Sequence, residues 1–578
     1  MRKFQQKGSK RISRRIAAGM LAFTMAFTMT ACSVGYEESD DPNGGGQSKV
    51  DGEKMQLYIG NFNQGFGEEW LKNAAARFSE LKKDKKYSDE TTGVQIIIDD
   101  ATIGEELIGS MATRRYEILF NESIDYYSWV QRGLVRDMTD IVEGDLGEYG
   151  EVGKTILSKM YPSAQENYKY TDGKYYAIPF YETTMGIIYD MDVFEANNLY
   201  MDKNGQFTLS SNTDPNASAG PDGDASTTVD NGLPATFSEF YAMCDAMKIR
   251  GVQPFTWTGK TPLYLTRFLQ SMAAYLDGFE ESRAYYDLSG NADNLVERFD
   301  GDQPVYMSDT QINGDNAYLM YQTAGKYYAL SFLESILNNG YHNESKLNSN
   351  AYGHREAQDD FVTNNTTMAS NSLKKDVAML IDGTWFMNEA LGTFEDLSKQ
   401  DYFAGTAERK FGLMPLPHPD GWENAKYLYL DTNRAACMVS ARTDDSKMEL
   451  VKEFIQFLHT DEELIAFTET TSTLRAYEYL SGYNPEEGKA TPYCKQLIAL
   501  KQYIGDQVVY PMSSNEKASN NISKLYGNGP LCFSSKVGDT VYDTPLTALS
   551  GSSKVSAKDY FLGLGTFHSR EWWNENIK

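Results

Sequence analysis

The sequence predicts an α/β protein with two folded domains. Strands and helices alternate in the first part of the folded chain, an order that favours a largely parallel sheet with helices on both faces. Residues 55 to 578 are also too many for one ordinary hydrophobic core. In sheets of this kind ligands bind beyond the carboxyl ends of the strands, so the turns after strands are the first places to search for a site.

The alternation begins with a predicted strand at residues 55 to 59. A helix should follow, because apolar residues recur there at helical spacing: Trp70, Leu71, Ala74, Ala75, Phe78 and Leu81. Residues 94 to 98 and 117 to 120 predict two more strands around another helical stretch. The turns at 61 to 65 and 121 to 123 are therefore candidate binding loops.

Two later helices are marked by signals at their first turns. Residues 236 to 239 have the form of a capping box, and an apolar face follows before Gly251. That face consists of Phe240, Met243, Cys244 and Met247. A similar face consists of Val451, Phe454, Ile455 and Leu458, and residues 460 to 463 have the form of a second capping box.

Between residues 209 and 232 the chain consists almost entirely of Ser, Asn, Asp, Ala, Gly, Thr and Pro. Such a composition predicts a solvated surface loop or a disordered insert. Its aspartates could bind calcium, but none of their spacings fits the helix-loop-helix calcium pattern. We therefore expect neither a metal nor any other cofactor.

The amino terminus predicts a secretory signal. Seven Lys or Arg residues precede an apolar run from Ile16 to Ala31, and the run is shorter than the roughly 20 apolar residues of a membrane-spanning helix. It ends in Met29-Thr30-Ala31-Cys32, which resembles a bacterial lipobox with Met where Leu is more common. We expect residues 1–31 to be a signal peptide and Cys32 to carry the lipid. The alternative is an ordinary cleaved signal in which Cys32 is incidental.

The segment 32–54 contains almost nothing apolar and cannot bury a core. It suits a flexible tether between a lipid anchor, such as palmitate, and the folded body. These features predict a protein at the extracytoplasmic face of the cell membrane.

The composition excludes some partners and favours others. A formal charge of −27 repels phosphates, and no basic stripe is interleaved with aromatic residues, so we expect no nucleic acid partner. The 39 Tyr residues exceed what a core alone usually needs. A tyrosine offers a flat apolar face and a polar tip, which suits sugar recognition, although most of these tyrosines are expected to be structural.

Four cysteines follow Cys32, and none of them has metal-ligand spacing. Cys244 and Cys437 lie in strongly periodic segments and are predicted to be buried thiols. Cys494 and Cys532 are the remaining pair that a disulfide could join in an exported protein.

Motifs for other chemistries are incomplete. Gly259-Lys260-Thr261 looks like the end of a phosphate loop, but Pro254 occupies the place of the earlier glycine. Gly563-Leu564-Gly565 begins a dinucleotide fingerprint that ends in His568. Neither a zinc-protease helix motif nor a Gly-x-Ser-x-Gly elbow is present in the sequence. We therefore do not expect nucleotide binding or these hydrolytic mechanisms.

Five segments, taken in order, resemble the family of carbohydrate-binding proteins of ABC importers to which maltodextrin-binding proteins belong. They lie within residues 60–78, 117–137, 173–190, 378–385 and 411–417, the last of which runs into the helix around Val451. Each is weak alone, but their order and spacing cover most of residues 55 to 475. The resemblance implies a periplasmic-binding-protein-like fold, with two lobes of mixed sheets flanked by helices, hinge crossings and a ligand cleft between the lobes.

The resemblance also implies where the chain crosses between the lobes. The crossings would lie near residues 179–183, near 431–434 and after about 475. Lobe 1 would then comprise 55–180 and about 434–475, and lobe 2 about 181–431 and about 476–578. Residues 209–232 and about 280–350 have the character of insertions, and the part after residue 480 matches the family poorly.

The matched positions supply the predicted ligand-binding residues. In the resembling family a tryptophan at the position of Trp385 stacks on a sugar ring, and a carboxylate on the first crossing contacts the ligand. The full predicted set is Phe62, Asn63, Asn121, Glu122, Tyr181, Glu182, Trp257, Trp385, Asn433 and Arg475.

The predicted function is a solute-binding lipoprotein, not an enzyme, that delivers a carbohydrate to the permease subunits of an ABC importer. We expect it to act as a monomer. Two alternatives stay open: an exported glycoside-active enzyme, which needs a pair of carboxylates across a glycosidic bond, and a binding protein for peptides or polyamines, whose cleft would present acids to ligand amines.

Overall fold

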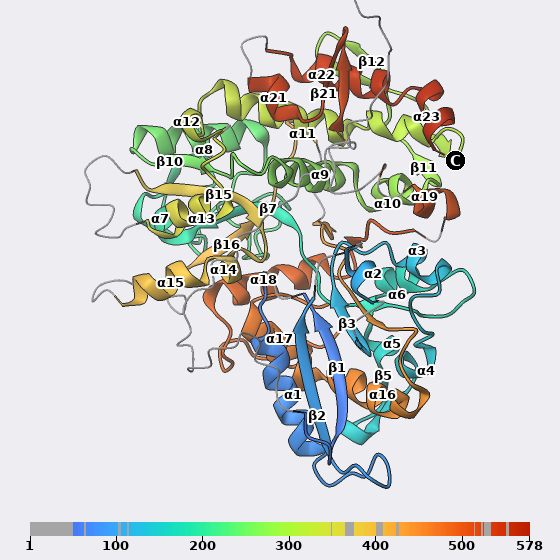
Figure 1. Ribbon diagram of the computed structural model, residues 1–578. Helices are drawn as coiled ribbons and strands as arrows, with labels where there is room; N and C mark the ends of the chain where they lie inside the picture. The colour runs from blue at the N-terminus through green and yellow to red at the C-terminus, as the bar shows by residue number, and fades with distance from the viewer. Residues whose placement is uncertain are drawn as a thin grey trace, which may run out of the picture. The chain divides into compact units, whose positions relative to one another are not determined.

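Two mixed β-sheets organise the chain in the computed structural model (Figure 1). The structure describes residues 50–62, 65–101, 104, 106–111, 115–347, 349–364, 375–399, 409–422, 427–513, 515–521, 524, 533–550 and 554–577. From Gln47 onward the chain forms one compact unit. The predicted signal peptide, Cys32 and most of the predicted tether lie outside the described residues.

The first sheet has the strand order β2 (Val94–Asp100), β1 (Met55–Asn61), β3 (Ile118–Asn121), β18 (Ala436–Val439) and β6 (Ile178–Pro179). The first three strands are parallel, as the alternation of strands and helices predicts. β18 enters from much later in the chain and runs antiparallel to β3 and β6. This late strand makes the sheet mixed.

The second sheet has the strand order β10 (Gln253–Thr256), β15 (Val377–Gly383), β7 (Met185–Asp190) and β16 (Phe411–Met414). β10 and β15 are parallel, and β7 is antiparallel to both β15 and β16. β15 and β7 are buried along their whole length, which explains their unbroken apolar sequences. Helix α9 (Leu263–Asp277) packs against this sheet.

The predicted helices form with one difference in their capping. Helix α1 (Glu69–Leu81) buries the predicted face, although Leu81 itself is exposed. Thr236 and Glu239 form the expected capping box at α8 (Phe237–Ile249). α16 (Met448–Phe457) and α17 (Asp461–Thr471) follow. Thr460 caps α17, but the Glu463 carboxylate binds Arg77 with both oxygens at 2.6 Å, so the second capping box is only half formed.

Shorter elements connect the two sheets and cover their edges. Those of the first part are α2 (Glu106–Met111), α3 (Tyr126–Gln131), α4 (Thr139–Val142), β4 (Asp145–Leu146), β5 (Glu151–Thr155), α5 (Ile156–Lys159), α6 (Pro162–Tyr168) and α7 (Met191–Ala196). Those nearer the second sheet are α12 (Glu344–Leu347), α13 (His354–Val362), α14 (Phe386–Glu389) and α15 (Leu391–Ser398).

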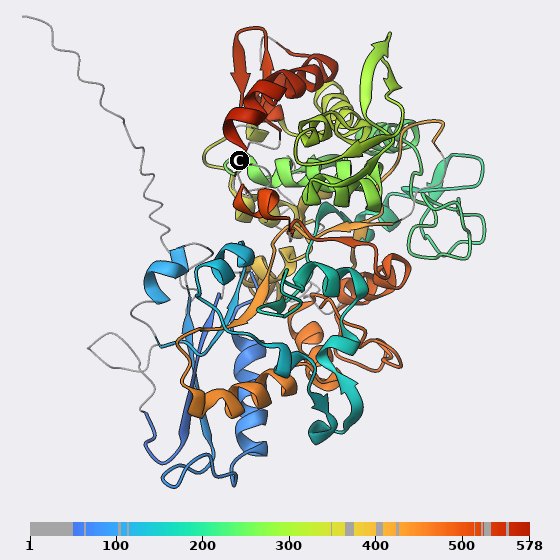
Figure 2. The same ribbon diagram turned by 90° about the vertical axis from the view of Figure 1, so that its right-hand side faces the viewer.

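The insert at 209–232 is folded as a series of turns, seen at the side of the molecule in Figure 2. It is preceded by a small hairpin of β8 (Tyr200–Met201) and β9 (Phe207–Leu209). The prediction of a solvated or disordered insert is wrong for its last part, because Val229, Asp230 and Asn231 are buried. The Tyr427 hydroxyl donates to the Asp230 carboxylate and fixes the loop to the body.

The second predicted insertion and the C-terminal part add helices and hairpins. Residues near 280–350 form α10 (Phe279–Asp287), β11 (Gly290–Ala292), β12 (Val296–Asp300), β13 (Gln303–Tyr306), β14 (Thr310–Ile312) and α11 (Ala324–Asn338). The C-terminal part forms α18 (Pro492–Ile504), β19 (Val508–Val509), α19 (Glu516–Asn520), β20 (Ser535–Val537), β21 (Thr540–Tyr542), α21 (Pro545–Ser550), α22 (Ala557–Phe567) and α23 (Arg570–Asn576). α22 packs on α11, so the two additions stabilise each other.

The chain passes between the sheets close to the predicted crossings. Residues 180–184 connect β6 of the first sheet to β7 of the second. The second passage includes β17 (Tyr429–Leu430) and leads into β18. β17 pairs with β19, so a C-terminal strand lies beside this passage. The backbone N–H of Glu182 donates to the carbonyl of Leu474 at 3.0 Å, which places the predicted third crossing next to the first.

The cysteines are thiols wherever the structure describes them. Cys244 and Cys437 are buried, as predicted. Cys494 is also a free buried thiol, and its Sγ lies 3.6 Å from the carbonyl oxygen of Thr468. Cys532, the other member of the pair that a disulfide could join, lies outside the described residues.

Among the described residues, no group of three or more His, Cys, Asp and Glu is arranged to hold a metal ion. Likewise, none of the helices described is both long and apolar enough to cross a membrane.

Candidate functional site

The turn after β3 lies beside the second passage between the sheets. Asn121 is fully buried, and its Oδ1 accepts hydrogen bonds from the backbone N–H groups of Gly104 at 2.8 Å and Glu122 at 3.0 Å. Ser123 adopts a positive φ of 57° and donates its N–H to the carbonyl of Asn433 at 2.8 Å. Asn121 therefore shapes the turn, and the turn is tied to Asn433.

Three predicted residues meet around one arginine. The Tyr181 hydroxyl of the first passage donates to Glu122 Oε2. Arg267, from α9, donates from Nη1 to Oδ1 of Asn433 at 3.3 Å and lies close enough to Glu122 to lower its pKa. The Tyr181 ring packs on Phe66 with a centroid distance of 4.5 Å. Glu122, Tyr181 and Asn433 thus share a site with Arg267, whose helix belongs to the second sheet.

The end of β15 supplies the opposite wall of the site. Trp385 precedes the single-turn helix α14, and Glu389 is the last residue of that helix. A Cβ atom at Gly383 would lie 2.2 Å from Cζ3 of Trp385, so the indole packs directly on this glycine. Tyr264 of α9 joins the wall: its ring centroid is 6.3 Å from that of Trp385 and its hydroxyl is 3.4 Å from Glu389 Oε2.

A buried amide connects two carboxylates behind this wall. Gln358 Nε2, from α13, donates to Asp382 Oδ2 at 3.0 Å and to Glu389 Oε2 at 2.8 Å. Gln358 is fully buried and Asp382 is 1% exposed, whereas Glu389 is partly exposed. Asp382 also accepts the N–H of Gly383 at 2.7 Å. Gln358 therefore anchors the end of β15 directly before Trp385.

Burial and like charges raise the pKa values of the carboxyls here. Burial raises the pKa of Glu122 to about 7; Tyr181 and Arg267 oppose this, and the charge of Glu389 adds to it. Burial and then Glu389 raise the pKa of Asp382 well above its ordinary value. Since Glu122 responds to both Arg267 and Glu389, the two walls belong to one electrostatic cluster.

The structure places two predicted charged residues inside the protein. Both carboxylate oxygens of Glu182 are occupied, by Lys501 Nζ at 2.8 Å and by the Tyr510 hydroxyl. Arg475 is 1% exposed, donates from Nη2 to His459 Nε2 at 3.1 Å and lies over the Phe467 ring at 4.9 Å. These contacts hold both side chains in the protein interior, and their role as ligand contacts stays a prediction.

Phe62 and Trp257 are also buried. Phe62 follows β1, is 9% exposed, and donates its backbone N–H to Phe120 at 2.9 Å. Trp257 follows β10 and stacks on His342 with a centroid distance of 5.2 Å. Among the described residues, neither side chain shares a hydrogen bond or ring contact with the cluster around Arg267. Asn63 lies outside the described residues.

Sequence reasoning missed Tyr264, Arg267, Gln358 and Glu389. Two signals were present in the sequence. Arg267 is the only charged residue between Lys260 and Asp277, on a helix whose other side chains are mostly apolar. Glu389 lies four residues after Trp385, so one helical turn places both on the same face. Gln358 had no such signal, because its role depends on contacts across the fold.

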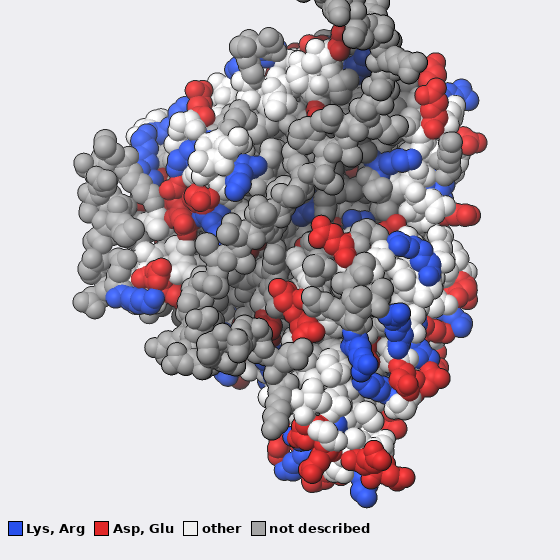
Figure 3. Space-filling view, viewed as in Figure 1, with Lys and Arg blue, Asp and Glu red and all other residues white. Residues whose placement is uncertain are grey.

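In the space-filling view, acidic and basic side chains gather around a recess (Figure 3). By its place in Figure 1 the recess lies between α9 and the part of the chain around α2 and α3. The turn with Glu122 precedes α3, and Arg267 belongs to α9.

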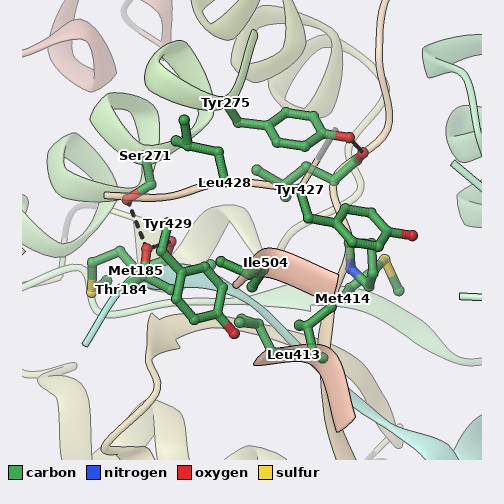
Figure 4. Close-up of a pocket in the computed structure, with 14 residues that line it drawn as sticks. Thr184, Met185, Ser271, Tyr275, Leu413, Met414, Tyr427, Leu428, Tyr429 and Ile504 are labelled. Atoms are coloured by element: carbon green, nitrogen blue, oxygen red, sulfur yellow. Dashed lines mark hydrogen bonds between the residues drawn. The ribbon is translucent and has the colours of Figure 1, made fainter. Parts of the chain in front are cut away.

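A separate, mainly apolar cavity lies beside the passages between the sheets (Figure 4). It is lined by Thr184, Met185, Gly186, Ser271, Tyr275, Leu413, Met414, Pro415, Leu416, Tyr427, Leu428, Tyr429, Leu500 and Ile504. None of the charged residues around Arg267 lines it. Its apolar walls and few polar groups set it apart from the cluster of Arg267 and Trp385, which is the candidate ligand site.

The family of the chain follows from its sequence. A model of the family described as "Bacterial extracellular solute-binding protein" matches residues 82–478. The chain belongs to this family. No curated protein sequence matches it. This solute-binding protein is therefore extracellular by family, and its family consists of binding proteins rather than enzymes.

Solved structures with the same fold agree with this assignment. The solute-binding protein is similar to "SBP RafE in complex with raffinose", with 14% identity, a TM-score of 0.51, and coverage of 89% of this chain and 100% of that chain. It is equally similar to the apo form of RafE from Streptococcus pneumoniae, with 14% identity, a TM-score of 0.51, and coverage of 90% and 100%. The predicted periplasmic-binding-protein-like fold is thereby confirmed.

Proposed function

We propose that this solute-binding protein captures a carbohydrate at the cluster around Arg267 and Trp385 and delivers it to the permease of an ABC importer. The supporting observation is the meeting of aromatic faces and polar groups at one site. Trp385 and Tyr264 offer apolar faces for the C–H groups of a sugar ring. Glu122, Arg267 and Asn433 offer carboxylate, guanidinium and amide partners for hydroxyls.

The site would lie between two lobes with the predicted boundaries, 55–180 with about 434–475, and about 181–431 with about 476–578. The assignment of β6 and β18 to one sheet and of β7, β15 and β16 to the other supports this division. Binding of the ligand to both walls would favour the closed arrangement over an open one. The description of the similar RafE with raffinose agrees with a carbohydrate ligand.

A thermal-shift screen of plant, host and storage oligosaccharides tests this function. A ligand present at 100 times its dissociation constant adds about 2.7 kcal/mol to the free energy of unfolding, which raises the melting temperature measurably. Titration calorimetry on each hit then gives the affinity. A panel in which peptides or polyamines bind and no carbohydrate does would contradict the proposal.

One observation keeps the exported glycoside-active enzyme as a second candidate. Glu122 has a pKa near 7 and lies within electrostatic reach of Glu389, and paired carboxyls with separated pKa values perform glycoside hydrolysis. We expect oligosaccharides incubated with the protein to stay intact, as chromatography would show. Shortened products that disappear in Glu122→Gln would favour the enzyme.

We also propose that Cys32 carries a lipid that holds the protein at the extracytoplasmic face of the membrane. The lipobox-like sequence and the polar segment after it support this proposal. Cys32→Ala should move the protein from the membrane fraction to the soluble fraction, with Cys244→Ala as the matched control. Equal retention of Cys32→Ala and the unmodified protein in the membrane fraction would exclude the anchor.

A further inference from the structure

The carboxylate pair behind Trp385 lacks a positive partner. Some other buried carboxylates in the protein are paired with a cation, as Glu182 is with Lys501 at 2.8 Å and Asp190 with Arg409 at 2.7 Å, whereas Asp431 accepts the backbone N–H groups of Thr183 and Arg434. In the described part of the chain, no Lys, Arg or His nitrogen lies within 4.0 Å of Asp382 or Glu389. Their shared partner is the neutral amide of Gln358.

Arg267, the arginine of the site, does not supply the missing positive charge beside Asp382 and Glu389. Arg267 donates to Asn433, and the carboxyl whose pKa it lowers is Glu122. The pKa of Asp382 responds to burial, to Glu389, to Gln358 and to Gly383, and to no positively charged group. With its pKa raised by burial and by the neighbouring Glu389, Asp382 favours its neutral form. Glu389 is the partly exposed member and therefore the one that a ligand can reach.

The groups around Glu389 define the shape of the missing partner. The Tyr264 hydroxyl lies 3.5 and 3.4 Å from the two Glu389 oxygens, and the Tyr264 ring meets the Trp385 ring at an interplanar angle of 70°. The His354 ring stacks on the Tyr264 ring with a centroid distance of 5.9 Å. A ligand here would contact an aromatic corner, formed by the rings of Trp385 and Tyr264, with the Glu389 carboxylate at its edge.

We propose that this subsite takes an amino sugar with a free, protonated amine. The ammonium group would donate to Glu389 and neutralise the pair, while the C–H face of the same ring would pack on Trp385 and Tyr264. A hydroxyl could form one of these hydrogen bonds but would leave the charge of the pair unbalanced. A linear polyamine would supply the charge and leave the aromatic corner without a ring to bind. This inference rests on the proposed carbohydrate function and specifies its substrate class.

Matched pairs of sugars test the inference. Chitosan oligosaccharides carry an amine where cello-oligosaccharides of the same linkage and length carry a hydroxyl, and glucosamine and galactosamine provide the same comparison with glucose and galactose. Titration calorimetry at a pH where the amines are protonated should show binding at least about tenfold tighter for the amine-bearing member. This preference should weaken with added salt.

Three variants distinguish a specific charge effect from loss of structure. Glu389→Gln should abolish the preference, and Glu389→Asp, which keeps the charge, should retain part of it. Glu395→Gln removes an exposed charge from α15 and should change nothing. Melting curves of each variant report folding. Equal or tighter binding of the neutral members, or binding of none of the amine-bearing sugars, overturns the inference. If neutral sugars bind and amino sugars do not, the proposed carbohydrate function stands and this inference alone falls.

Discussion

Arg267 has more hydrogen-bonding capacity than the described residues use. A guanidinium group has five N–H donors, and Arg267 has one hydrogen bond to a described residue, to Asn433 at 3.3 Å. Its charge is balanced at longer range by Glu122. The unused donors lie where Glu122, Tyr181 and Asn433 meet, so we expect them to bind ligand hydroxyls rather than to support the fold.

Arg267→Ala should therefore weaken carbohydrate binding with little effect on stability. Hydrogen bonds to a charged group contribute about 1.5–3 kcal/mol, so we expect the dissociation constant to rise at least about tenfold. Calorimetric titration with a sugar found by screening measures this change. Arg298→Ala, at an exposed position of β12, is the control and should leave the affinity unchanged. An unaltered affinity in Arg267→Ala would remove this residue from the site.

Trp385 has both a packing role and a proposed binding role. Its indole packs on Gly383 and is 5% exposed, so its removal affects the protein as well as the ligand. We expect Trp385→Ala to raise the dissociation constant about thirtyfold or more and to lower the free energy of unfolding by about 3 kcal/mol.

A second buried tryptophan separates the two roles of Trp385. Trp573, in α23, is fully buried and donates from Nε1 to the Gly314 carbonyl at 2.8 Å. Trp573→Ala should lower stability without changing the affinity for sugar. If Trp385→Ala behaves in the same way as this control, Trp385 is a core residue and not a ligand contact.

At the scale of elements, α18 and β19 tie the C-terminal part to the passages between the sheets. Lys501 of α18 pairs with Glu182 of the first passage, and β19 pairs with β17 of the second. Asp506 accepts from the backbone N–H of Ser163 at 3.0 Å, which adds a contact to α6. The C-terminal part therefore contributes directly to the connection between the two sheets.

Breaking the pair of Glu182 and Lys501 should be costly. Both side chains are almost fully buried, so Lys501→Met leaves an unpaired buried carboxylate and should destabilise the protein by about 3–5 kcal/mol. Adding Glu182→Gln should recover much of this loss, because the charge is then removed as well. Urea unfolding measures both variants. Lys495→Met breaks a more exposed pair with Glu486 and should cost less than about 1 kcal/mol; a similar loss in both lysine variants would contradict the prediction.

Elements with local signals could be predicted, and those that depend on distant contacts could not. The Thr236 capping box forms because both of its members lie within one turn. Glu463 has the same local spacing, but Arg77 offers it two charge-assisted hydrogen bonds from another helix. The contacts of Glu182 and Arg475 were also not predictable from local spacing, because they depend on the fold: Lys501 donates to Glu182, and Arg475 donates to His459, 16 residues earlier in the chain.

At the scale of the whole molecule, the first parallel strands and the order of the family segments were enough to predict the fold. The buried end of the 209–232 insert was not predictable from its polar composition, because its burial depends on Tyr427. The predicted residues that the structure brings to the candidate site, Glu122, Tyr181, Trp385 and Asn433, lie at a strand end or on a passage between the sheets. The candidate-site residues on α9 and α13 lie in segments that neither end a strand nor form a passage between the sheets.

The buried carboxyls of the whole molecule set the pH dependence of its stability. Burial raises the pKa of Asp230 and Asp431 from 3.8 to about 7 and that of Asp190 to about 6. A carboxyl whose pKa is higher in the folded state stabilises the fold fully below its unfolded pKa. This contribution is lost as the pH rises through the folded pKa. These groups therefore lower the stability progressively between about pH 4 and pH 7.

Carboxyls with lowered pKa values act in the opposite direction at lower pH. The pKa values of Asp202, Asp444 and Asp461 lie below 3.8, because backbone or side-chain donors or lysines stabilise their charged forms. Their contribution is present above the unfolded pKa and is lost as the pH falls through the folded one. Together, the carboxyls with raised pKa values and those with lowered pKa values predict that the free energy of unfolding is highest at a pH below 7.

We therefore expect a higher melting temperature at pH 5 than at pH 8, measured at constant ionic strength. The formal charge of −27 acts in the same direction, because deprotonation increases self-repulsion. Asp230→Asn should flatten this slope: the amide keeps an oxygen for the Tyr427 hydroxyl and can no longer ionise. Asp444→Asn removes an exposed carboxyl and should leave the slope between pH 5 and pH 8 unchanged. A melting temperature that rises from pH 5 to pH 8 would show that the buried carboxyls are ionised without loss of stability, and that unfolding is governed by other groups.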